Sequence, residues 1–225
     1  MDDIFSLLKA VPTAFATLLP VINPLGTAVI LLGLTSRADA ATHRGIARSV
    51  ATNAVILLLV VLVAGRLFLA LFGISVEIVQ LAGGMVLVGM GWNMLFQPDA
   101  PAAAKAQDSP TGEHGDYSGS IFYPFTFPLT IGPGSIAVAL TLSAHTSREH
   151  VMATVMTQAG AAIGVVAAAF VTYLCLANAD RLASRLGPSG LSVLMRLSAF
   201  IVVCLGAEIA WSGVDKLIHS LGTGS

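Results

Sequence analysis

Charged residues divide the chain into long uncharged stretches. Stretches without Asp, Glu, Lys or Arg run over 10–36, 49–65, 78–98, 117–147 and 150–179, and a sixth stretch, 197–214, is interrupted only by Glu208. A helix needs about 20 apolar residues to cross the hydrocarbon core of a bilayer. Two stretches are shorter than this but can be extended. The stretch 49–65 lies between Arg48 and Arg66, whose long side chains can reach the interface, and the stretch 197–214 can begin earlier, near Leu191. The pattern therefore predicts six membrane-spanning helices.

The same stretches do not suit the strands of a membrane barrel, which alternate apolar and polar residues over about ten positions. Residues 54–64 read AVILLLVVLVA and residues 163–171 read IGVVAAAFV, so both are apolar on every side. We therefore expect an all-α polytopic membrane protein. The first span follows Met1-Asp2-Asp3 rather than the positive charge of a signal peptide, which predicts a retained helix.

Composition excludes the main alternatives to a membrane protein. Of the 225 residues, 56% are hydrophobic and 10% charged, with a mean hydropathy of +0.86. A soluble domain is about 25% charged. A soluble enzyme and a disordered protein are thus excluded, and the lipid bilayer is the expected partner. With a net charge of −1, the chain has no basic field to attract nucleic acid.

One long polar segment, residues 97–120, separates two groups of three predicted helices. It mixes Pro, Ala and Gly with charges of both signs, a composition that cannot build a core and is typical of a flexible connector. The expected organisation is a single membrane domain. It comprises a first three-helix repeat over 1–96, the connector over 97–120 and a second repeat over 121–225.

Basic residues in the loops indicate the orientation in the membrane. With six spans, both termini lie on one side. Seven basic residues then face one side and four the other: Arg37, Arg44, Arg48, Lys105, Arg181, Arg185 and Arg196 against Lys9, Arg66, Arg148 and Lys216. Because Lys and Arg favour the cytoplasmic side, both termini are predicted to be non-cytoplasmic in a multi-pass protein of the cell (inner) membrane.

Pro and Gly recur at matching places in the two halves. Pro20 precedes Gly26 by six residues in the first helix, and Pro128 precedes Gly134 by six residues in the fourth. The match extends through the later helices, with Thr52-Asn53 opposite Thr157-Gln158 and the glycine turns 72–75 and 186–189. Because a three-helix unit is odd-numbered, its second copy enters from the opposite face. This predicts a 3+3 inverted repeat, which is common in secondary transporters.

These clusters are expected to break helices 1 and 4 near the middle of the bilayer. Proline removes a backbone donor, and glycine permits unusual backbone angles. Unpaired backbone at that depth must lie inside the protein or line a cavity, where a half-helix N-terminus can bind a carboxylate. Asn23 is placed to cap the first half-helix. The competing interpretation is a simple kink in a packed bundle. The candidate substrate-binding residues are Asn23, Pro24, Gly26, Thr27, Gly132, Pro133, Gly134 and Ser135.

Four more polar residues are candidates for ion coupling or for lining the path: Glu208, Asn93, Asn53 and Gln158. Glu208 lies well inside a span, where an ionisable group is a functional candidate. The alternative is a wet position near the outer interface, about two turns before Asp215. Asn53 and Gln158 suit hydrogen bonds between helices better than a place on the path, and Asn93 suits packing against Gly or a bond to another helix.

Other chemistry is not indicated. The sequence has no His or Cys spacing typical of a metal site, no phosphate-binding loop and no recognisable nucleophile with its base, so we expect neither an enzyme nor a cofactor. Residues 160–164 form a small-residue face that allows close helix approach. That contact lies either within the fold or between two copies of the chain in a homo-oligomer.

A set of short motifs carries a family resemblance. They are Asn23-Pro24-Leu25-Gly26, Phe72-Gly73-Ile74-Ser75, Leu81-Ala82-Gly83-Gly84, Pro124 to Pro128 with Gly132-Pro133-Gly134, and Arg196-Leu197. Together they resemble the MarC family of small bacterial inner-membrane proteins, over nearly the whole chain apart from the connector. That family includes proteins assigned as neutral amino acid transporters and is grouped with carriers of the lysine-exporter type. The resemblance implies a six-helix carrier for glycine, alanine or similar solutes, driven by an ion gradient.

The chain departs from the family pattern at two positions. Gln80 stands where members often have Arg, and Glu208 stands where they often have Gln. The acid at 208 either changes the substrate or the coupling, or shows that this position is peripheral.

Three functions fit the sequence. The first is a secondary transporter of small zwitterions, coupled to a proton or a sodium ion, which rocks around a solute held at the half-helix N-termini. The second is a channel for water or a small neutral solute. The third is a non-transporting membrane factor, which an uninterrupted bundle would suit.

Overall fold

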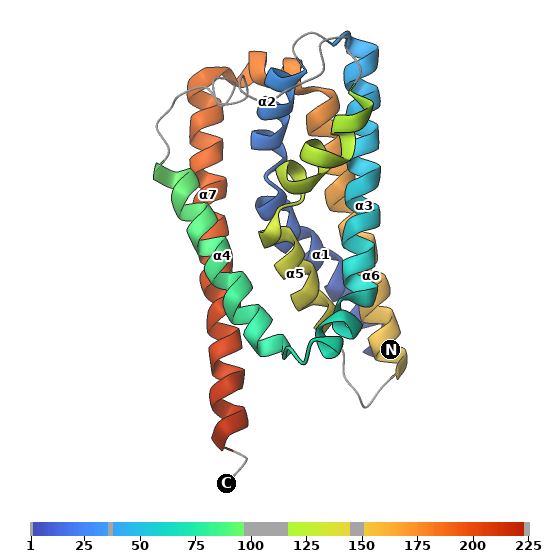
Figure 1. Ribbon diagram of the computed structural model, residues 1–225, viewed down its shortest axis with the longest axis vertical. Coiled ribbons are helices and arrows are strands. Elements are labelled where there is room, and N and C mark those ends of the chain that lie inside the picture. Colours follow the sequence, from blue (N-terminus) through green and yellow to red (C-terminus); the bar gives the residue numbers. More distant parts are fainter. Residues whose placement is uncertain (1, 36–37, 97–116, 145–150, 223–225) are drawn as a thin grey trace.

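The computed structural model describes residues 2–35, 38–96, 117–144 and 151–222. Within these ranges the chain is almost entirely helical and contains no strand (Figure 1). The helices are α1 (Asp2–Ile22), α2 (Pro24–Leu34), α3 (Ala40–Leu71), α4 (Val76–Phe96), the short η2 (Ser118–Ser120), the irregular η3 (Ile121–Thr130), α5 (Pro133–Ala144), α6 (Val151–Ala177) and α7 (Ala179–Gly222). The all-α prediction is confirmed for this part of the chain.

Among the described residues, five helical stretches are long and apolar enough to cross a membrane: Phe5–Leu34, Ala40–Leu71, Val76–Phe96, Met152–Ala177 and Ser189–His219. A sixth span results if the two segments Ser118–Thr130 and Pro133–Ser143, which meet at an angle of 71°, are counted as one. The sequence-based count of six is thus reached only with this bent pair. The first span contains both α1 and α2 and counts as a single stretch.

The helices form two groups that differ in how much side-chain surface they bury. The helices α1, α2, α3, η3, α5 and α6 pack around buried clusters that include Leu18, Leu58, Ile131 and Val165. Beside them, α4 and α7 run along each other as a pair at one edge of the molecule (Figure 1). The pair exposes many large apolar side chains, among them Trp92, Phe200 and Trp211, which in a bilayer face lipid.

Glycines bring α4 and α7 into backbone contact. A Cβ added to Gly206 would lie 2.7 Å from the nitrogen of Val88, and one added to Gly91 would lie 2.8 Å from the oxygen of Ala199. Small residues at helix interfaces allow this approach without a hydrophobic driving force. The two helices are therefore closely packed against each other, whereas their contact with the other helices is less extensive.

The small-residue face of α6 packs within the fold. A Cβ on Gly160 would meet the carbonyl oxygen of Leu7 at 2.6 Å, and one on Gly164 would meet the Cβ of Ala14 at 2.7 Å. The α1–α6 contact thus uses the surface that the sequence left open to either an internal or an intermolecular role.

The predicted connector lies mostly in 97–116, outside the described residues. Its last residues are structured: Tyr117 is buried and its ring lies 6.4 Å from that of Phe125, just before η2 begins. Burial of its aromatic ring holds Tyr117 against η3.

Candidate functional site

The first interruption, at Asn23 between α1 and α2, is almost fully hydrogen-bonded. Asn23 adopts a left-handed conformation with φ 49° and ψ 65°. Its side-chain Oδ1 accepts a hydrogen bond from Gly26 N at 3.2 Å, so Asn23 caps α2 as its position before Pro24 predicts. Its own nitrogen still donates to Leu19 O at 3.1 Å, and its carbonyl accepts from Thr27 N at 3.0 Å.

The remaining polar groups at this interruption are also largely occupied. Pro24 has no amide proton, and the Thr27 hydroxyl donates to Ile22 O at 3.2 Å. Gly26 lies under the Asn23 side chain, because a Cβ there would sit 3.0 Å from Asn23 Cγ. Within the described residues, only the amide of Leu25 in this first turn has no partner. The N-terminus of α2 is thus closed by its own cap.

The second interruption, between η3 and α5, is open by comparison. Ile131 has extended backbone angles, and α5 restarts at Pro133, which supplies no amide proton. The first hydrogen bond of α5 runs from Ile136 N to Gly132 O at 3.3 Å. The amides of Gly134 and Ser135 precede it and have no partner among the described residues, as expected for the first turn of an uncapped helix.

Ser135 adds an unsatisfied hydroxyl at the same place. It is 1% exposed, and its Oγ has no hydrogen-bond partner in the described part of the chain. Side chains in a helix tilt toward the N-terminus, so this hydroxyl leans toward the free amides of the first turn. A buried polar atom without a partner is costly, which marks the site as one that a polar ligand would complete.

Residues of α4 cover this N-terminus. A Cβ at Gly134 would lie 2.5 Å from Leu87 Cδ2 and 3.4 Å from Met90 Sδ, and one at Gly132 would lie 3.6 Å from Met90 Cε. A side chain at position 134 therefore requires the end of the Leu87 side chain to shift. The cover belongs to the α4–α7 pair rather than to the helices that carry the interruption.

The amides Asn53 and Gln158 both bond to neighbouring helices. Asn53 Nδ2 donates to Thr126 Oγ1 in η3 at 3.5 Å, and Gln158 Nε2 donates to Ser143 O near the end of α5 at 3.2 Å. Gln158 Oε1 and Ser143 Oγ are buried and have no partner in the described residues. The interhelical interpretation therefore describes what both amides do in this structure.

The two remaining candidates lie on the α4–α7 pair. Asn93 on α4 and Glu208 on α7 are both exposed, and neither approaches the two interruptions through any described hydrogen bond. The buried polar contact of this pair is a different one: Gln80, 1% exposed, accepts a hydrogen bond from Lys216 Nζ at 3.3 Å. Sequence reasoning noted Gln80 only as a departure from the family pattern.

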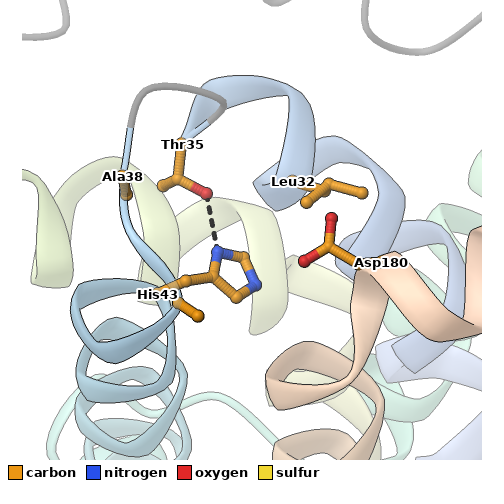
Figure 2. Close-up of a pocket in the computed structure, with 6 residues that line it drawn as sticks. Leu32, Thr35, Ala38, His43 and Asp180 are labelled. Atoms are coloured by element: carbon orange, nitrogen blue, oxygen red, sulfur yellow. Dashed lines mark hydrogen bonds between the residues drawn. The ribbon is translucent and has the colours of Figure 1, made fainter.

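A second polar site, which sequence reasoning missed, surrounds His43. This histidine lies in the first turn of α3, after the N-cap Asp39, and is 5% exposed. It borders two overlapping cavities of about 260 and 230 Å³ at the end of the bundle where α2 ends and α3 and α7 begin. Figure 2 shows its ring between Thr35 and the carboxylate of Asp180, with Leu32 and Ala38 completing the wall. The signal available in the sequence was Asp39-Ala40-Ala41-Thr42, a helix start that places His43 inside the helix.

The cap of α3 is itself a titrating group. The hydroxyl of Thr42 and then its backbone N–H, which donates to Asp39 Oδ1 at 2.8 Å, hold the pKa of this carboxyl below its ordinary value. Among the described residues, no three His, Cys, Asp or Glu side chains converge to form a metal site.

Comparison with known proteins supplies a family. The model of the MarC family of integral membrane proteins matches residues 8–218. The chain is 27% identical over 222 residues to the inner membrane protein MarC of Salmonella typhimurium, covering 98% of this chain and 99% of that protein. The proteins of that name from Salmonella arizonae and Escherichia coli are 29% and 26% identical over 224 and 228 residues, with the same coverage. No solved structure matches the chain.

Proposed function

Since the chain belongs to the MarC family of integral membrane proteins, we propose that it is a secondary transporter of small zwitterionic solutes, with neutral amino acids as the substrate class. It moves them across the inner membrane without chemical change, as a multi-pass protein whose termini are both non-cytoplasmic. The observation that carries the proposal is the N-terminus of α5. There, two free amides and the orphaned Ser135 hydroxyl lie together in a buried position.

This N-terminus suits a carboxylate in both charge and geometry. The dipole of a helix places partial positive charge at its first turn, where free N–H groups point at the ligand. The hydroxyl of Ser135 supplies a third donor. Leu87 and Met90 border the site closely, which favours a solute with a small side chain over one with a large side chain.

The packing of the helices supports a 3+3 inverted repeat. Exchanging the halves pairs α1 and α2 with η3 and α5, α3 with α6, and α4 with α7. Under that exchange, the contact of α1 and α2 with α6 corresponds to the contact of η3 and α5 with α3. The contact of α5 with α4 corresponds to the contact of α1 and α2 with α7. The contacts α3–α6 and α4–α7 map onto themselves. Such a symmetry is common among carriers that work by alternating access.

In this account, the α4–α7 pair is the body that uncovers the site. Its backbone contacts make it move as a unit, and Leu87 and Met90 cover the α5 N-terminus from α4. A glycine with positive φ precedes the membrane-spanning part of each helix of the pair. Gly73, with φ 66°, lies before α4, and Gly187, with φ 63°, lies inside α7 just before the span Ser189–His219. A Cβ at either glycine would meet nothing within 4 Å, so both turns have free space around them.

Counterflow in proteoliposomes tests the function directly. Vesicles preloaded with unlabelled glycine or alanine should take up the labelled amino acid in a saturable way. Flux that does not saturate, with rapid shrinkage under osmotic shock, would indicate a channel instead. No exchange of any neutral amino acid would contradict transport and favour a non-transporting role.

A pair of serine variants tests the site. Ser135→Ala should raise the KM for glycine about tenfold, the effect of losing one hydrogen bond to a charged group. Ser143→Ala is the matched control, because Ser143 lies on the same helix, is 1% exposed and also has an unpartnered Oγ in the described structure. Equal effects of both substitutions would contradict carboxylate binding at the α5 N-terminus.

A further inference from the structure

Glu208 lies near the middle of the membrane-spanning part of α7. Gly84, close to the midpoint of the 21-residue helix α4, packs against this part of α7, because a Cβ at Gly84 would lie 2.5 Å from Gly206 O and 2.7 Å from Ala210 Cβ. A helix of 21 residues is just long enough to cross the hydrocarbon core. Glu208, which stands between Gly206 and Ala210, is therefore close to the centre of the bilayer.

The side chain of Glu208 lies on the outer face of α7, away from the other helices. Gly206 faces α4, and Leu205 and Ile209 pack against the core of the bundle. Glu208 itself is exposed and has no partner among the described residues. The remaining side of α7 carries a stripe of exposed side chains at helical spacing, here called the outer stripe: Leu197, Phe200, Ile201, Cys204, Glu208 and Trp211.

Lipid suits the apolar members of the outer stripe but not the acid. Acidic side chains inside a membrane almost always face protein or a water-filled space, because hydrocarbon offers them no hydrogen-bond partner. Asn93, also exposed, lies only three residues from the end of α4, where headgroups and water are near. Glu208 is too far from either end of its span for this escape. The acid therefore indicates that a polar group covers this part of the stripe.

A second copy of the chain supplies a polar group at the required depth. Copies of a membrane protein insert in the same orientation, so a two-fold axis between two of them runs along the membrane normal. Each residue near such an axis meets its own counterpart at the same depth. Two carboxyl groups that hold a proton between them are complementary, since one donates and the other accepts.

We propose that the outer stripe of α7 is a homodimer interface, in which Glu208 hydrogen-bonds to Glu208 of the second copy. Hydrogen bonds between helices stabilise their association in lipid, and the apolar members of the stripe pack around this bond. The small-residue face of α6 does not compete for this role, because α1 covers it. The α4–α7 pairs of the two copies form the centre of the dimer. This pairing does not depend on the proposed transport function.

Single-molecule photobleaching of the dye-labelled protein in lipid vesicles tests the dimer. Wild-type protein should bleach in two steps, and dilution into more lipid should give its dissociation constant. Glu208→Leu should raise that constant about tenfold, the effect of losing one hydrogen bond between membrane helices. Glu208→Gln keeps a donor and an acceptor and should remain close to wild type. Leucine is favourable in a membrane helix, so Glu208→Leu should still fold, which thermal unfolding in detergent checks.

Asp215→Leu is the matched control. It removes an acid from the same face of α7, about two turns later, where Asp215 is exposed and lies beside His219. Since this acid is near the end of the span, water can satisfy it, and its loss should leave the dissociation constant unchanged. An equal effect of Asp215→Leu and Glu208→Leu would mean that net charge, rather than the pairing at 208, controls association.

Oxidative cross-linking tests which face forms the contact. Copper phenanthroline, which oxidises neighbouring thiols to a disulfide, should cross-link the wild-type protein through Cys204, one turn from Glu208 on the outer stripe. Cys204→Ser should abolish the product, and Cys175→Ser should not. Gly89→Cys, added to Cys204→Ser, places a thiol on the exposed face of α4 and should give no product.

Three results would overturn the proposal. The first is a wild-type protein that bleaches in one step at every protein density, which would leave Glu208 facing lipid or a different membrane protein. The second is a dimer whose dissociation constant is the same in Glu208→Leu. The third is a dimer that cross-links through Gly89→Cys but not through Cys204, which would place the interface on α4.

Discussion

The interruptions at Asn23 and Gly132 look alike in sequence but differ in what they leave unpaired. Each combines proline with glycine at the same spacing. At the first, the Asn23 side chain takes up the amide of Gly26, and the two helices still count as one span. At the second, the segments meet at 71°, and the amides and hydroxyl of the first turn of α5 remain free. Proline and glycine interrupt a helix, but the capping side chain decides whether its N-terminus is available to a ligand.

The largest expected effect comes from filling the second interruption. Gly134→Leu places a side chain where Leu87 already lies 2.5 Å from a Cβ, over the free amides. Counterflow should fall by about 100-fold or more, because the substitution blocks the carboxylate position and its donors. Expression and folding should change less, as judged by size-exclusion elution in detergent.

Gly89→Leu provides the control for that substitution. Gly89 lies on α4, is exposed, and a Cβ there would meet nothing within 4 Å. Its transport should stay within about twofold of wild type, as is usual for a surface change. Similar losses at Gly89 and Gly134 would show that the loss at Gly134 is not specific to the interruption.

The first interruption should respond to substitution in stability rather than in substrate affinity. Asn23→Ala removes the cap and places a residue with a Cβ at φ 49°, so thermal unfolding in detergent should show a loss of about 1–2 kcal/mol. Asn23→Gly suits the backbone angle but still lacks the cap, which separates the two causes. The KM of either variant should match wild type, and a rise like that of Ser135→Ala would mean that α2 also binds the solute.

The hydrogen bond from Asn53 to Thr126 joins α3 to the segment before the second interruption. At 3.5 Å it is long, so a double-mutant cycle with Asn53→Leu and Thr126→Val should give a coupling energy below about 1 kcal/mol. Thermal unfolding of the four proteins measures it. A larger value would mean that this bond holds the bend in place.

The smallest expected effect concerns Asp39, the N-cap of α3, whose carboxylate provides a charged cap to set against the neutral cap of Asn23. Its folded pKa lies below the ordinary value, so its stabilisation is present above the ordinary pKa of an Asp and is lost as the pH falls through the lower, folded pKa. Protection of the first turn of α3 should therefore decrease in acid. Asp39→Asn, which caps without a charge, should not show this decrease.

Much of the fold could be predicted because it depends on apolar runs and charge spacing. The helices begin near Pro24, Val76 and Pro133, where proline, glycine turns and capping residues stand in the sequence. The asymmetry of the two interruptions could not be predicted in the same way. It depends on whether Asn23 turns back onto Gly26 and on which helix covers Gly134, and both are set by tertiary contacts. His43 was missed for the same reason, because its partners Thr35 and Leu176 O come from other helices.

The central claim is that the solute carboxylate binds at the N-terminus of α5. Solid-state NMR can measure the distance from the carboxyl carbon of ¹³C-glycine to the backbone nitrogens of ¹⁵N-serine in lipid vesicles. The account predicts one serine nitrogen within about 4 Å, the separation when an N–H donates to a carboxylate oxygen. That signal should vanish in Ser135→Ala and persist in Ser143→Ala. Bound glycine with no serine nitrogen near its carboxyl carbon, or a signal that survives Ser135→Ala, would contradict the account.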